Sequence, residues 1–177
     1  MKHILTIAVL LISIHLANAQ EKLNPIIKNF GGIYEIPEAT VIPNSELRYK
    51  IVVDAKTGAD DKSELAFALY NSARMINLHA VGGVQKENLE VVLAIHGGAT
   101  YSILKNSVYK KKFGVDNPNI PLIKELKAAG VKLVVCGQSL IGRKIDHDQV
   151  LSEIEIATSM LTTVSTYQLN GFAVFQF

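Results

Sequence analysis

The sequence lacks several features that would define a class of function. Its one cysteine, Cys136, excludes an intrachain disulfide and a cysteine-rich zinc module. The formal net charge of +2 is too small for the positive surface that nucleic-acid binding requires. Neither a GxGxxG nor a Walker motif occurs, and there is no internal repeat or low-complexity segment. We therefore expect no nucleic-acid partner, no bound metal and no cofactor.

Residues 1–19 have the layout of a signal peptide, and no long apolar run occurs in the sequence after them. Lys2 provides the positive charge, an apolar stretch follows, and Ala17-Asn18-Ala19 forms a small-x-small cleavage site. Because Gln20 rather than cysteine follows, a lipid anchor is not expected. We expect an exported protein, periplasmic or secreted, with no membrane span.

The remaining chain has the composition of one folded domain, since 49% of all residues are hydrophobic. Residues 20–47 contain three prolines and no sustained period, which indicates an extended arm that could lie over a neighbouring subunit. The alternative is a flexible tail. From residue 48 to 177, short apolar runs alternate with helical patterns. Strands are expected at 49–54, 90–96, 131–136, 154–157 and 172–176, and helical segments at 61–81, 98–111, 118–129, 139–144 and 159–170. This alternation predicts a parallel sheet between helices, although it does not give the strand order.

Polar residues follow several of these strands. Asp54 ends the first strand, His96 the second and Cys136 the third. Ligands of open parallel sheets bind at the carboxyl ends of the strands, so we expect these three side chains at one edge. They define the candidate site.

Cys136 is the strongest candidate for chemistry within this site. The residues that follow it, Gly137-Gln138-Ser139, begin a short helical turn whose backbone N–H groups favour a thiolate, and a thiolate is a good nucleophile. Arg143 adds positive charge nearby. The alternative interpretation is a buried cysteine that packs as a small hydrophobe.

His96 is the second candidate, as a base or proton donor beside Cys136. Gly97 and Gly98 follow it and enter a helical stretch, so their backbone could approach an anion closely. A cysteine–histidine hydrolase that uses Asp54 as the orienting carboxylate remains open on residue types alone.

Several motifs together resemble the DsrE/DsrF-like sulfur-relay family, particularly its exported members. They are the first strand Tyr49–Asp54, the segment Ile95–Ala99, the segment Asn117–Leu122, and Val135-Cys136-Gly137-Gln138-Ser139-Leu140 followed by a basic segment with glycine. The last of these is the most specific. The resemblance extends from Tyr49 to the C-terminus.

This resemblance implies a three-layer α/β/α sandwich with a mostly parallel five-stranded sheet, assembled as a trimer or hexamer. In the sulfur-relay members a cysteine after a central strand carries a persulfide and passes its outer sulfur to a partner, and Cys136 matches that position. We expect a homo-oligomeric, sulfurtransferase-like sulfur carrier with a protein or small sulfur species as donor and acceptor. The alternative is a non-catalytic, oligomeric ligand-binding or structural protein that keeps the family fold.

Overall fold

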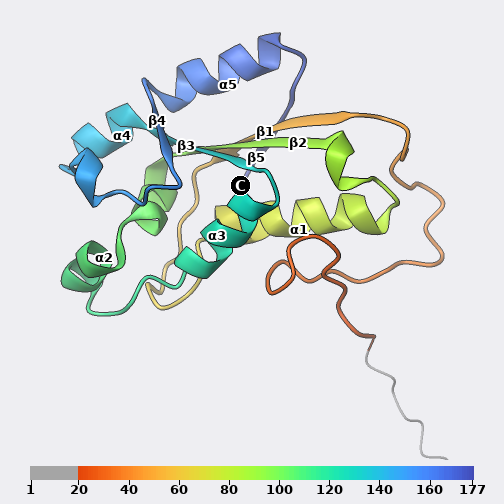
Figure 1. Cartoon of the computed structure of the whole chain (residues 1–177), viewed down its shortest axis with the longest axis horizontal. Coiled ribbons are helices and arrows are strands. Elements are labelled where there is room, and N and C mark those ends of the chain that lie inside the picture. Colours follow the sequence, from red (N-terminus) through yellow and green to blue (C-terminus); the bar gives the residue numbers. More distant parts are fainter. Residues whose placement is uncertain (1–19) are drawn as a thin grey trace, which may run out of the picture.

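The computed structural model describes residues 20–177, so the expected signal peptide at 1–19 lies outside the described part. Figure 1 shows five strands that form one sheet in the order β4-β3-β2-β1-β5, and every neighbouring pair is parallel. The strands are β1 (Tyr49–Ala55), β2 (Leu89–Ile95), β3 (Lys132–Cys136), β4 (Glu155–Ala157) and β5 (Ala173–Gln176). The predicted α/β fold with a five-stranded parallel sheet is confirmed.

Helices cover both faces of this sheet. The helices are α1 (Phe67–Val81), α2 (Asn106–Phe113), α3 (Ile120–Ala128), α4 (Gly137–Gly142) and α5 (Met160–Leu169), with 3-10 segments η1 (Lys86–Asn88), η2 (Gly97–Ile103) and η3 (His147–Gln149). In Figure 1, α1 and α3 lie below the sheet and α5 lies above it. Among residues 20–177, no helix combines the length and the apolar character needed to cross a membrane.

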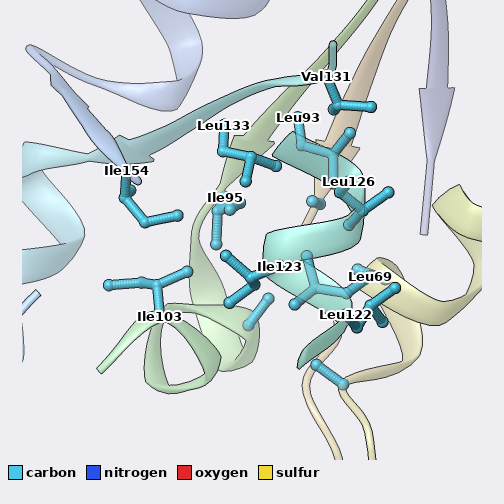
Figure 2. Packing of buried hydrophobic residues seen from close by; sticks show 14 of the residues in the cluster. Leu69, Leu93, Ile95, Ile103, Leu122, Ile123, Leu126, Val131, Leu133 and Ile154 are labelled. Carbon is cyan, nitrogen blue, oxygen red and sulfur yellow. The ribbon is translucent and has the colours of Figure 1, made fainter. Parts of the chain in front are cut away.

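The two faces of the sheet are buried very differently. Because successive strand residues point to opposite faces, one set of strand side chains packs against α1 and α3. Figure 2 shows this larger core, with Leu93, Ile95 and Leu133 of the strands against Leu122 and Leu126 of α3. The opposite face buries only a small cluster of Val52, Val92, Val134 and Phe172 under α5. None of the residues of α5 is buried.

The segment expected to be an extended arm contains a compact loop on its own chain. Leu23 and Ile33 pair antiparallel, which closes the loop, and Ile27 between them is fully buried. The buried side chain of Asn77 in α1 accepts hydrogen bonds from the N–H groups of Ile26 and Ile27 and donates to three carbonyls of the loop. The loop backbone is thus held by one polar side chain, an arrangement that local sequence patterns do not reveal.

Two helices begin or end differently from the sequence-based expectation. Residues 61–66 form turns in which Asp61 accepts from the N–H of Ser63, and α1 begins only at Phe67. The expected helix at 98–111 is divided into η2 and α2. The division falls at Leu104, which is fully buried and bridges to Val150. Tertiary pairing therefore overrides the local helical pattern there.

Candidate functional site

The carboxyl ends of the three central strands bring the predicted residues to one edge. The pairing of Ala55 with Ile95, and of Ile95 with Val135, places His96 and Cys136 side by side in the next row. Asp54, His96 and Cys136 alternate with core residues that face α1 and α3, so their side chains point to the α5 face. The order across the edge is Asp54, His96, Cys136.

Asp54 and His96 form a hydrogen-bonded pair at this edge. Nε2 of His96 contacts Oδ1 of Asp54, and the two side chains are only 13% and 17% exposed. A carboxylate in this position favours the imidazole with its proton on Nε2, which donates to Asp54. Nδ1 of His96 is then left for a second proton or a second partner. Asp54 therefore acts on the site by orienting His96.

Cys136 ends β3 and precedes α4 directly, and its residue is 7% exposed. Burial raises the pKa of the Cys136 thiol, but hydrogen bonding outweighs this effect and leaves the pKa below its ordinary value. The hydrogen bonds come from the N–H of Met160, the hydroxyl and N–H of Ser139, and the N–H of Gln138. The site thus stabilises a thiolate.

Gly97, Gly98 and Gly137 occupy positions where the protein's own backbone lies very close. A Cβ at Gly97 would lie 2.9 Å from the carbonyl oxygen of Lys56, and one at Gly98 would lie 3.2 Å from the nitrogen of Gly58. Gly97 also has φ +55°. A Cβ at Gly137 would lie 2.8 Å from the carbonyl oxygen of Ala157. These glycines let the loops at the strand ends pack closely together.

Arg143 follows α4 directly and contacts Tyr101 and Ser139. Its guanidinium carbon is 5.7 Å from the centre of the Tyr101 ring, and Nη1 points to the carbonyl of Ser139 at 3.5 Å. Within residues 20–177, its buried Nε has no hydrogen-bond partner. Arg143 thus packs α4 against η2 and leaves a donor that no protein group uses.

The N–H of Met160 is the functional group that sequence reasoning missed. Met160 is the first residue of α5, and its donor reaches Cys136 because β4 pairs Ala157 with Cys136. The sequence carries one signal for this position, since Ser159 is a helix N-cap and its hydroxyl accepts from the N–H of Thr162. That signal locates the start of the helix but not its neighbour in space.

In the part of the chain that the structure describes, no group of three or more His, Cys, Asp or Glu residues is placed to hold a metal ion. The chemistry offered is that of a cysteine whose thiolate is stabilised, next to a histidine that is hydrogen-bonded to Asp54.

Comparison with known proteins assigns the chain to a family. The model of the DsrE/DsrF-like family matches residues 48–177. The structure resembles a protein of unknown function from Methanobacterium thermoautotrophicum, with a TM-score of 0.56 and 16% identity over 73% of this chain and 99% of that one. It also resembles the ychN protein from E. coli, with a TM-score of 0.54, 25% identity and the same coverage. Comparison with curated proteins gives no significant match. The family model covers the whole sheet and every residue of the candidate site, and the chain belongs to the DsrE/DsrF-like family.

Proposed function

We propose that this protein works in a sulfur relay and that Cys136 carries sulfane sulfur as a persulfide. Membership of the DsrE/DsrF-like family supports a sulfur-relay type of function in general. The observation that carries the specific proposal is the environment of the thiol, where four hydrogen-bond donors from α4 and α5 lower its pKa in spite of burial. A thiolate is the form that attacks a sulfur–sulfur bond.

The reaction is a sulfur transfer that needs no external oxidant or reductant. The Cys136 thiolate attacks the outer sulfur of a donor R–S–SH, a new S–S bond forms, and the S–S bond of the donor breaks. The products are the Cys136 persulfide and the thiolate R–S⁻, so charge and electrons balance. The same step in reverse, with an acceptor thiolate attacking the outer sulfur, returns Cys136 to its starting form.

His96 and Asp54 have distinct roles in this proposal. His96 lies next to Cys136 in the adjacent strand, where it can supply a proton to the leaving thiolate or remove one from the entering thiol. Asp54 is a positioning residue, because its carboxylate contacts the imidazole and lies one strand further from the sulfur. The donors of Gln138, Ser139 and Met160 stabilise the negative charge on the Cys136 sulfur before it attacks the donor.

Brief exposure to inorganic polysulfide, followed by measurement of the intact mass, tests this proposal. We expect the folded protein to gain one sulfur atom, to lose it on reduction, and to gain it faster than the denatured chain. The rate should rise with pH through a midpoint below that of a thiol in the unfolded chain, because the pKa of Cys136 is lowered.

Cys136→Ser is the control for that experiment and should gain no sulfur while keeping its circular dichroism spectrum. Labelling of the wild type only after denaturation would contradict the proposal, because the buried thiol would then be closed to donors. Such a result would favour the alternative of a ligand-binding protein that keeps the family fold.

We further propose that the protein is exported and assembles as a homo-oligomer. The signal-peptide layout of residues 1–19 supports export. The intact mass of protein recovered from cells should then correspond to a chain that starts at Gln20. Exposed apolar side chains of α5 and β5, including Leu161 at 73% and Leu169 at 89%, support assembly through these side chains. Sedimentation equilibrium should give a trimer or hexamer, and a monomer at micromolar concentration would contradict assembly.

A further inference from the structure

A small groove lies between α5 and the edge of the sheet formed by β3 and β4. Its volume is about 300 Å³, which is at the lower end for small-molecule pockets and too small for a folded partner. Its lining combines apolar residues with polar ones, and the polar residues include Lys132, Glu155, Thr158, Thr162, Thr166 and Tyr167. No step of the proposed sulfur transfer uses these side chains.

The groove lies beside β3 on the same face of the sheet as Cys136, although Cys136 is not one of its lining residues. Lys132, Val134 and Cys136 alternate along the strand and share the α5 face, and the first two line the groove. Ala157 and Thr158 line its other end, where Ala157 pairs with Cys136 and the nearby N–H of Met160 reaches the sulfur. Cys136 lies four residue positions after Lys132 along the strand, which corresponds to about 13 Å.

Opposite charges close the end of the groove that is far from Cys136. Nζ of Lys132 lies 3.2 Å from Oε2 of Glu155, and the two side chains are 45% and 54% exposed. Hydrogen bonds to Glu155 and to Tyr167 raise the pKa of Lys132, so the ammonium group stays charged. An accessible ammonium beside an accessible carboxylate matches a free amino-acid group, in which one carbon carries both a carboxylate and an ammonium.

The wall of the groove supplies hydroxyl groups between these two ends. The hydroxyls of Thr162 and Thr163 bond to the carbonyl of Ser159. In residues 20–177, the hydroxyls of Thr158 and Thr166 have no hydrogen bond to the protein. These two groups are free to bind the amide groups of a short peptide.

We propose that this groove binds the persulfide of a small peptide thiol, with its free amino-acid end at Lys132 and Glu155 and its outer sulfur at Cys136. This inference rests on the proposed function of Cys136 and names the class of its donor. A peptide of three residues spans about 10 Å when extended, and the Lys132 side chain covers the remaining distance. An inorganic anion would be too small to fill the groove, and the carboxylate of Glu155 would repel it.

The transfer from this donor balances as before. The Cys136 thiolate forms a bond to the outer sulfur, the S–S bond of the peptide persulfide breaks, and the peptide leaves as its thiolate. The leaving peptide then takes up a proton at the edge where His96 lies.

S-methylglutathione tests the groove separately from the transfer, because it has the peptide and the free amino-acid end but no sulfane sulfur. We expect it to bind the wild-type protein and to shift the amide resonances of Thr158, Thr163 and Thr166 in a titration followed by NMR. Lys132→Gln and Glu155→Gln should each weaken binding about fivefold, as expected for the loss of one partly exposed charge contact. Lys124→Gln removes the same charge from an exposed position of α3 and should change nothing.

Each other outcome overturns part of the inference. Tighter binding by Glu155→Gln would mean that the groove recognises an anion and not a free amino-acid group. Absence of binding to the wild type would overturn the donor class, while sulfur gain from polysulfide would leave the proposed function standing. Binding without any sulfur gain would retain the groove as a ligand site and would contradict the persulfide role of Cys136.

Discussion

Gly137→Ala is expected to destabilise the fold and to make Cys136 less reactive at neutral pH. The added Cβ would lie 2.8 Å from the carbonyl oxygen of Ala157, so β3 and the β4–α5 junction must move apart. Strain of this kind lowers the free energy of unfolding by about 2 kcal/mol. The movement also withdraws the N–H of Met160 from Cys136, so the thiol pKa should rise toward its ordinary value. Each unit of that rise lowers the thiolate fraction about tenfold.

Urea denaturation and the pH profile of alkylation by iodoacetamide measure the two effects. Gly142→Ala is the matched control, because it lies at the other end of α4 and its Cβ would have no atom within 4 Å. We expect this control to keep the wild-type profile and to be as stable as the wild type or slightly more stable. An alkylation profile of Gly137→Ala that matches the wild type would show that close packing of β3 against the start of α5 does not activate the thiol.

Asn77→Ala is expected to lower the free energy of unfolding by about 3 kcal/mol. The Asn77 side chain is fully buried and bonds five backbone groups of residues 26–31. Asn24 also donates to the carbonyls of Ile27 and Phe30, so these two keep a partner in the variant. The N–H groups of Ile26 and Ile27 lose theirs, and buried groups without partners are costly.

Thermal or urea denaturation checks this value, and limited proteolysis shows whether residues 23–33 are released first. Asn71→Ala is the control. Among residues 20–177, the Asn71 side chain bonds only within its own helix, donating to the carbonyl of Phe67 and accepting from Arg74, and it lies near the surface. We expect the control to change stability by less than about 0.5 kcal/mol. A similarly small change for Asn77→Ala would mean that the loop is not an integral part of the fold.

Strands and most helices follow from the sequence because their signals are local. Val91, Val92 and Leu93 lie in a near-continuous apolar run, which is typical of a strand covered on both faces, and this run became β2. Gly82 stops α1 at the expected place. The division between η2 and α2 did not follow, because the contact of Leu104 with Val150 spans a long stretch of chain.

The candidate site shows the same division between local and non-local information. The positions of Asp54, His96 and Cys136 at strand ends follow from the apolar runs that precede them. The hydrogen bond between His96 and Asp54 depends on the pairing of β1 with β2. The position of the Met160 N–H next to Cys136 depends on the pairing of β3 with β4. Neither pairing can be read from spacing along the chain.

The sequence by itself determined the α/β class, the strand ends that carry polar residues, and the cysteine at the third of them. Local periodicity is sufficient for these, because hydrophobic spacing reports which face of each element is buried. Only the tertiary structure decided the strand order, the shared face of Asp54, His96 and Cys136, and the donors around the sulfur. It also placed Lys132 and Glu155 in a groove on the same face of the sheet as Cys136. These features arise where elements distant in sequence pack together, and the free energy of that packing depends on the whole core.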